Sequence, residues 1–218
     1  MTKASGCRFD DLQKVYSVEM PSVTAESVLD RFRRVGAYLE GHFRLTSGLH
    51  SPGYMQCALV LAHPREAEAL GAELAERVRS LNPNVVLSPA LGGIVIGQEV
   101  GRGLGVRALF AERQDGVLTL RRGFTLSPSD RVLVVEDVVT TGKSTRETID
   151  VARAAGAQVV GAGAIIDRSG GDQLAGAEGP GLHVPFHALA TVSLPTYPPE
   201  SCPLCAAGQP VVKPGSRA

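Results

Sequence analysis

One short segment limits the possible folds of this chain more than any other. Residues 132–135 read Val-Leu-Val-Val, and Glu136 and Asp137 follow them directly. An unbroken apolar, β-branched run is typical of a parallel strand that is buried on both faces. The sequence from Ser144 to Gly156 then predicts a helix. Because open α/β sheets bind their ligands at the carboxyl ends of the strands, we expect the acidic pair and the loop after it to lie at a binding site.

The loop between this strand and helix has the features of an anion site. Its residues are Val138, Val139, Thr140, Thr141, Gly142, Lys143 and Ser144. Its backbone N–H groups would face the positive end of the helix, which favours a bound anion. The last three residues match the end of a nucleotide-binding Walker loop, but that pattern needs a glycine where this chain has Asp137. A carboxylate there would repel a triphosphate, so we exclude an ATPase or GTPase. Two adjacent carboxylates suit the vicinal hydroxyls of a ribose better.

A second loop of the same kind is predicted after residues 84–88. It contains Ala90, Leu91, Gly92 and Gly93. Two glycines allow backbone amides to approach a ligand closely, which makes a second anion site plausible. On its own this pattern fits a simple tight turn equally well.

The rest of the chain alternates between strand and helix patterns. Strands are expected at 84–88, 106–111, 131–136 and 158–166, and helices at 64–81, 93–104 and 144–156. Such alternation predicts a right-handed, parallel α/β sheet. A further helix is expected from Ser22 to Gly41. We expect a small hairpin or hood strand over 42–60, and a hairpin or lid over 112–129.

Composition excludes several classes of function. The 218 residues can form one core, and the 22 basic and 22 acidic residues balance. We therefore expect no nucleic-acid partner, no membrane association and a cytoplasmic location. Cys202-Pro-Leu-Cys205 has the spacing of a zinc knuckle, but a closed site needs four ligands and no second pair lies nearby in the sequence. We therefore predict neither a zinc ion shared across a dimer nor any other protein metal site.

The segment 132–144 resembles the phosphoribosyl pyrophosphate motif of the type I phosphoribosyltransferases. The resemblance implies that Glu136 and Asp137 hold ribose O2 and O3, that the loop through Ser144 wraps the 5′-phosphate, and that residues 90–93 bind the pyrophosphate. It also implies the family's fold, a central, mostly parallel sheet flanked by helices with a small hood subdomain.

A second resemblance concerns the acceptor. Residues 41–55 resemble the hood strand of the orotate phosphoribosyltransferases, which places Tyr54 and Met55 beside the pyrimidine ring. Arg168, after Ile165-Ile166-Asp167, matches the family's arginine that meets orotate, and Thr140 matches a threonine that contacts the same base. A guanidinium fork suits the carboxylate of orotate. Met55 as core filler and Arg168 as a solvated surface residue remain the alternatives.

The resemblance implies transfer of the phosphoribosyl group to orotate, with Mg²⁺ and in a homodimer. Catalytic roles fall to Glu136, Asp137 and the lid arginines Arg113 and Arg121, with Arg122 as a further candidate. Lysines that many members of the family have are replaced here by Thr46 and Gly92.

We expect a mobile leader over 1–20 and one domain over 21–218, in which the hood comprises about 41–60 and 168–200. The alternatives are a purine salvage transferase and a non-catalytic regulator that senses the donor.

Overall fold

The computed structural model describes residues 25–45, 47–170 and 181–214. The predicted leader, Thr46 and the last four residues lie outside these ranges. In the part of the chain that is described, no helix combines the length and the apolar character needed to cross a membrane.

A six-stranded sheet forms the centre of the molecule, in the order β5-β4-β3-β6-β7-β8. All neighbouring strands run parallel except the β4–β5 pair, which is antiparallel. The predicted mostly parallel sheet is therefore confirmed. The strands are β3 (Val85–Pro89), β4 (Arg107–Gln114), β5 (Val117–Leu120), β6 (Arg131–Val139), β7 (Gln158–Asp167) and β8 (Phe186–Thr191).

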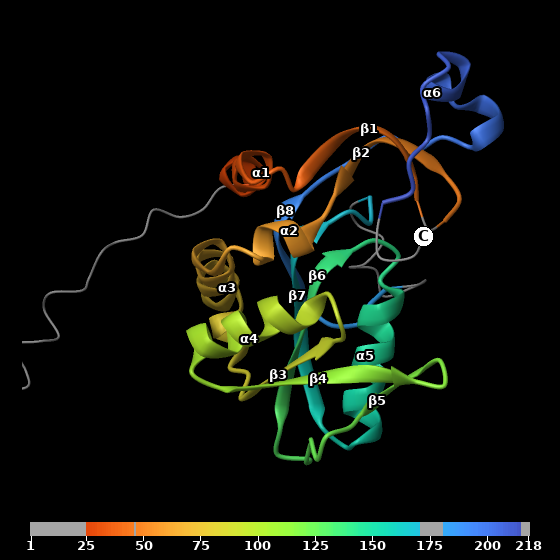
Figure 1. Ribbon diagram of the computed structural model, residues 1–218. Coiled ribbons are helices and arrows are strands. Elements are labelled where there is room, and N and C mark those ends of the chain that lie inside the picture. The colour runs from red at the N-terminus through yellow and green to blue at the C-terminus, as the bar shows by residue number, and fades with distance from the viewer. Residues whose placement is uncertain (1–24, 46, 171–180, 215–218) are drawn as a thin grey trace, which may run out of the picture.

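Strand β6 is buried on both faces, as its sequence predicts. Val132 and Val134 belong to one hydrophobic cluster, together with residues of α5 (Lys143–Ala154). Leu133 belongs to the opposite cluster, together with residues of α3 (Pro64–Val78) and α4 (Gly93–Leu104). Figure 1 shows these two helices on one side of the sheet and α5 on the other. Towards the carboxyl end of β6, Asp137 and Val138 remain partly exposed.

Strand β6 continues three residues beyond its predicted end at Glu136. It pairs with β7 up to Val139, which lies opposite Asp167. The pairing continues because β7 is long and Val139 is itself buried. The acidic pair therefore lies within the last half of a strand, where backbone pairing fixes both residues more firmly than a loop would.

The region before the sheet differs from its prediction. Helix α1 (Ala25–Arg34) does not reach Gly41, because Gly36, with φ of +68°, ends it. The Gly36 N–H donates to the Arg33 carbonyl and the Ala37 N–H to the Phe32 carbonyl, which together form a Schellman motif. Tyr38–Arg44 forms β1, which pairs antiparallel with β2 (His50–Met55) in a separate two-stranded sheet. A short helix, α2 (Cys57–Leu61), follows where an extended chain was expected.

The hairpin predicted within 112–129 is present as β4–β5. Its turn consists of Asp115 and Gly116, with φ of +52° and +85°. Two consecutive residues with positive φ are typical of a type I′ turn, whose twist matches the strands that it joins. Strand β4 is longer than predicted, because this pairing extends it to Gln114.

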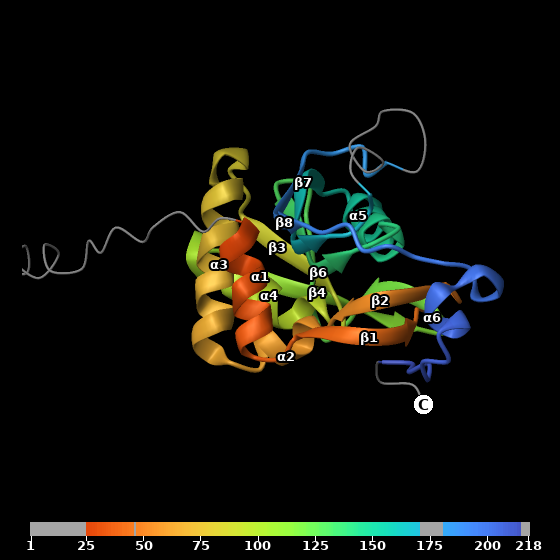
Figure 2. The same cartoon turned by 90° about the horizontal axis from the view of Figure 1, so that it is seen from above.

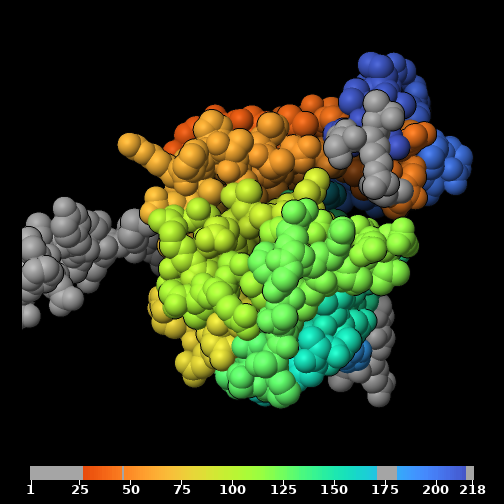
Figure 3. All heavy atoms as spheres, turned by 60° about the horizontal axis from the view of Figure 1, so that its bottom comes forward, coloured from red at the N-terminus to blue at the C-terminus, as the bar shows by residue number. Residues whose placement is uncertain are grey.

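The segment after residue 180 contributes more to the fold than its glycine and proline content predicts. Strand β8 adds a parallel edge strand to the central sheet, which the sequence analysis missed. Beyond it lie the short helices η3 (Pro199–Ser201) and α6 (Pro203–Ala206). Tyr197 pairs with His50 of β2, and Val212 pairs with Phe43 of β1. Figures 2 and 3 show this blue segment beside one end of the β1–β2 hairpin. The C-terminal tail beyond β8 thus packs against this hairpin.

Candidate active site

A cavity of about 520 Å³ lies where the carboxyl ends of β6 and β7 face the β1–β2 hairpin. It is lined by all four residues for which base contacts were predicted, and by Asp137 and Thr141 of the donor motif. Segments more than 100 residues apart in the sequence therefore meet at one site. The four predicted base contacts are Tyr54, Met55, Thr140 and Arg168.

The two carboxylates of the acidic pair occupy different environments. Glu136 is 7% exposed, whereas Asp137 is partly exposed and lines the cavity. Burial, and then the neighbouring charge of Asp137, raise the pKa of Glu136 well above its usual range. Asp137 Oδ1 accepts the Val138 N–H at 2.8 Å, and Glu136 Oε1 accepts the Asp137 N–H at 3.3 Å. Asp137 is thus positioned to accept hydrogen bonds from a ligand, while Glu136 binds protons more readily.

The predicted pyrophosphate loop packs directly against Asp137. A Cβ atom added at Gly92 would lie 2.9 Å from each carboxylate oxygen of Asp137. One added at Gly93 would lie 2.9 Å from the Val135 carbonyl oxygen. Leu91 is 84% exposed, and the peptide between Ala90 and Leu91 is cis. The glycines therefore allow the loop to approach the acidic pair, and a lysine at position 92 would require the loop or Asp137 to move.

The loop after β6 leads into α5 as the motif predicts. Gly142 has φ of +71° and occupies the N-cap position, where it offers no side chain to cap the helix. Thr140, Thr141 and Lys143 are exposed. The N-terminal end of α5 therefore faces an accessible loop of hydroxyl and amide groups, which is a suitable environment for a phosphate.

Arg168 is the positively charged residue in the lining of the cavity. Its backbone N–H donates to the Val139 carbonyl at 2.8 Å, which attaches the residue to the end of β6. Its Nε atom is buried and has no hydrogen-bond partner among the residues that the structure describes. Burial lowers the pKa of Arg168, an effect that Tyr54 and Cys57 oppose. A buried guanidinium donor without a partner marks a place for an anionic ligand group.

The two predicted hood contacts are adjacent at the end of β2. Tyr54 is partly exposed, and burial is the main cause of its raised pKa. Met55 is 4% exposed and belongs to the hydrophobic core, so it lines the cavity and fills the core at once. The two interpretations of Met55 are therefore compatible.

Sequence reasoning missed Gln56 and Cys57 in the cavity wall. The Cys57 Sγ lies 3.9 Å from the Asp137 carbonyl oxygen. Burial, followed by Asp137 and Glu136, raises the pKa of this thiol well above its usual range, which keeps it neutral. The predicted hood segment 41–55 ends directly before these two residues, and the fold brings them to the same cavity.

The lid arginines do not line this cavity. Arg113 donates to the Gly116 carbonyl at 2.7 Å and pairs with Glu147. Arg122 binds Glu112 at 2.8 Å, and Arg121 lies 4.0 Å from the same carboxylate. The structure therefore does not bring Arg113 and Arg121 to the predicted catalytic position in their own chain. The reason is that β4 and β5 form the far edge of the sheet, where carboxylates closer to them serve as partners (Figure 1).

Comparisons with known proteins agree with this site. Residues 59–175 match the family model of the phosphoribosyl transferase domain, which defines the class of enzyme. Orotate phosphoribosyltransferase from Pelotomaculum thermopropionicum is 52% identical over 89% of this chain and 99% of its own length. That from Desulforamulus reducens is 51% identical over 88% and 97%. The chain belongs to the orotate phosphoribosyltransferase family, whose members are pentosyltransferases.

Solved structures support the fold. A Mycobacterium tuberculosis orotate phosphoribosyltransferase in complex with inorganic phosphate has a TM-score of 0.61 at 22% identity, over 77% of this chain and 94% of that chain. An adenine phosphoribosyl transferase from Trypanosoma brucei has a TM-score of 0.58 at 18% identity, over 75% and 79%. The same fold therefore occurs in enzymes for different bases. Identity over the full length, and not the fold, distinguishes the orotate family from the purine alternative.

Proposed function

We propose that this cavity is where the chain carries out the reaction of its family, the transfer of a phosphoribosyl group from phosphoribosyl pyrophosphate to orotate. The products are orotidine 5′-monophosphate and pyrophosphate. The observation that carries the assignment is the unpartnered, buried Nε of Arg168 in the same cavity as Asp137. A carboxylate distinguishes orotate from uracil, and a guanidinium is the side chain that recognises a carboxylate best.

Base recognition uses three elements of the fold. Arg168 at the end of β7 binds the orotate carboxylate, and Tyr54 and Met55 of β2 contact the ring. Thr140, at the end of β6, contacts the same base. The ring thus lies between the hood hairpin and the central sheet.

Donor recognition uses the two loops at the carboxyl ends of β3 and β6. Asp137 and Glu136 accept hydrogen bonds from the ribose hydroxyls, and the Val138–Ser144 loop binds the 5′-phosphate at the N-terminal end of α5. Residues 90–93 bind the pyrophosphate. The packing of Gly92 against Asp137 supports this proposal, because it brings the two loops to one side of the cavity.

The reaction needs no covalent nucleophile. As the bond from C1 of the ribose to the pyrophosphate oxygen breaks, its electron pair leaves with the pyrophosphate and the sugar becomes oxocarbenium-like. The base nitrogen supplies the electron pair of the new bond to C1, and its proton passes to the departing pyrophosphate or to solvent. The negative charge of Asp137 favours the cationic sugar, and the bound loops hold the reactants in line.

The oxygen atoms available at the cavity fit Mg²⁺ as the cofactor. Asp137 presents a hard, partly exposed carboxylate to the cavity, and the pyrophosphate and ribose oxygens of the donor would supply most other ligands. When bound, Mg²⁺ neutralises charge on the pyrophosphate leaving group. The residues of this chain orient the donor and exclude water.

The positions of the lid arginines favour a homodimer in which the hairpin serves the partner's cavity. Arg113, Arg121 and Arg122 lie on the edge hairpin and not at their own cavity. A mixture of an Arg121→Ala chain with an Asp137→Asn chain should recover activity that neither homodimer shows. No recovery would exclude action across subunits.

We further propose a single domain over 21–218, with the hood and lid as predicted, and a cytoplasmic location for the enzyme. The hairpin formed by β1 and β2 supports the hood assignment.

An acceptor assay tests the proposed function. The enzyme is given Mg²⁺ and donor with orotate, uracil, hypoxanthine, guanine or xanthine in separate reactions. We expect turnover with orotate alone. Turnover of a purine in place of orotate would assign the chain to salvage, and tight RNA binding without turnover of any base would support a regulator.

A further inference from the structure

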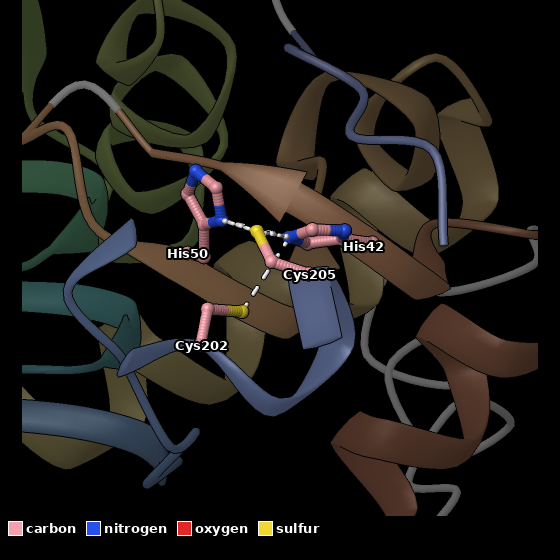
Figure 4. Close-up of side chains that lie close together, drawn as sticks. All are labelled: His42, His50, Cys202 and Cys205. Carbon is pink, nitrogen blue, oxygen red and sulfur yellow. Dashed lines mark hydrogen bonds between the residues drawn. The ribbon is translucent and has the colours of Figure 1, made fainter. Parts of the chain in front are cut away.

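Four side chains with metal-binding atoms meet at the outer end of the hood, away from the substrate cavity. His42 belongs to β1 and His50 begins β2, while Cys202 and Cys205 lie at the start of α6 and within it. Figure 4 shows the four side chains pointing toward one another. One ligand atom from each lies within 4.8 Å of all the others.

The fold gives the cysteine pair a second pair of possible ligands that does not lie nearby in the sequence. The histidines are more than 150 residues away in the sequence but are in contact with the thiols in the fold. The tail returns to the hairpin because Tyr197 pairs with His50 and Val212 pairs with Phe43. Backbone pairing on either side of the Cys202–Cys205 segment thus places it beside the two imidazoles.

The distances fit a tetrahedral ion with two nitrogen and two sulfur ligands. The Cys205 Sγ lies 3.3 Å from His50 Nδ1 and 3.7 Å from His42 Nε2, and the Cys202 Sγ lies 3.6 Å from His42 Nε2. Zn–S bonds of about 2.3 Å and Zn–N bonds of about 2.0–2.1 Å place tetrahedral ligand atoms about 3.3–3.8 Å apart. The two ring nitrogens, 2.8 Å apart, need only a small separation to admit the ion.

The surroundings of His42 fix the tautomer of its imidazole in the form that can bind a metal. Its Nδ1 lies 2.8 Å from the Gln209 carbonyl oxygen, which can only accept a hydrogen bond. Nδ1 therefore carries the proton, and Nε2 presents its lone pair to the cluster. A backbone carbonyl behind a histidine ligand is the usual way to fix its tautomer. His42, His50 and Cys202 are buried and Cys205 is exposed, so the site is enclosed but remains accessible to an ion on one side.

We propose that His42 Nε2, His50 Nδ1, Cys202 Sγ and Cys205 Sγ bind one structural zinc ion. Two thiolates and two neutral imidazoles are the donor set that zinc prefers, and together they neutralise its charge. Binding releases the two thiol protons to solvent. Four protein ligands leave no open position, so the ion is structural and takes no part in the reaction.

The zinc site attaches the C-terminal tail to the hood. The Val212 N–H donates to the His42 carbonyl at 2.8 Å, and the Arg44 N–H donates to the Val212 carbonyl at 2.8 Å. The ion adds a crosslink to this short pairing. Because β2 runs from His50 to the cavity residues Tyr54 and Met55, the site holds in place the strand that forms one wall of the cavity.

Metal analysis of the full-length protein tests the proposal. Protein purified under reducing conditions, without added chelator, should contain one equivalent of zinc per chain. After the zinc is removed, Co²⁺ should bind with the absorption of a tetrahedral thiolate complex, and Zn²⁺ should displace it. The thermal midpoint of the zinc-depleted protein should fall by about 5 °C or more and recover with Zn²⁺.

Matched variants locate the ion. Cys202→Ser and Cys205→Ser should lose bound zinc, whereas Cys205→His should keep it because imidazole is also a zinc ligand. Cys57→Ala and His63→Asn, which change the same residue types outside the cluster, should keep the zinc of the native protein. The Co²⁺ measurement on native protein remains decisive if a serine variant does not fold.

Two results on the native protein would overturn the proposal. One is reduced native protein that contains no zinc and takes up no stoichiometric Zn²⁺ or Co²⁺. The other is native protein in which Cys202 and Cys205 are joined by a disulfide and no metal is bound. Loss of zinc from Cys57→Ala to the same extent as from Cys202→Ser would place the ion elsewhere and would equally contradict it.

Discussion

Replacement of Arg168 by alanine should remove most of the enzyme's ability to use a base that carries a carboxylate. The guanidinium lies in the cavity with a buried Nε that has no partner among the described residues. Burial lowers the pKa of Arg168, which means that the buried charge reduces the stability of the folded protein when no ligand is bound. Orotate would supply the missing partner.

The magnitude follows from the type of bond that is lost. A hydrogen bond to a charged group contributes about 1.5–3 kcal/mol, which corresponds to an increase of about 10- to 150-fold in the Kd for orotate. Arg168→Lys should lose less, because an ammonium keeps the charge but lacks the planar fork. Folding stability should not fall with either change, since the native guanidinium gains little from its own chain.

The measurements are the Kd for orotate and the Kd for uracil, each determined separately. The Kd for phosphoribosyl pyrophosphate serves as the reference. Only orotate binding should weaken, because uracil lacks the carboxylate and the donor binds elsewhere in the cavity. Arg102→Ala is the control, since Arg102 is an exposed residue of α4 that pairs with Glu68 and Glu99. Equal weakening of orotate and uracil binding, or no weakening of either, would refute the role of Arg168.

Three further changes test the donor side and the buried acid. Glu136→Gln should stabilise the ligand-free protein increasingly as the pH rises above the usual pKa of a glutamate, because a raised folded pKa means that native stability is lost as the pH rises; thermal melts check this, and a constant difference would contradict it. Gly92→Ala should lower the free energy of unfolding by about 1–3 kcal/mol through overpacking against Asp137 and should weaken donor binding by displacing that carboxylate; unchanged melting and an unchanged donor Kd would contradict this. Asp137→Asn should lower kcat/KM equally for every acceptor that is turned over, and a loss selective for one base would contradict a role at the ribose.

Much of the fold could be predicted because its signals are local. The apolar run of β6 and the periodic pattern of α3 each report a strand or a helix within a few residues. The predicted end of α1 at Gly41 was wrong, because the helix ends at Gly36, whose positive φ the helical pattern does not reveal. Strand β8 was missed because its short sequence becomes a strand only through pairing with β7.

The donor half of the site could be read from the sequence because the acidic pair and the phosphate loop are contiguous. The acceptor residues were named through the resemblance, but only the fold shows that Tyr54, Thr140 and Arg168 share one cavity, because the hood packs over the sheet. Cys57 gave no signal at all, because a cysteine at the start of a short helix resembles an ordinary core residue.

The sequence by itself determined the parallel sheet and the position of the strand-loop-helix motif for which a sugar phosphate is predicted, because both are encoded by neighbouring residues. Tertiary structure alone decided which residues meet across long separations. It gave Cys202 and Cys205 the histidine partners that the sequence did not indicate, and it placed the lid arginines away from their own cavity. The physical reason is that backbone pairing with the hood hairpin, and not local pattern, brings the tail to His42 and His50.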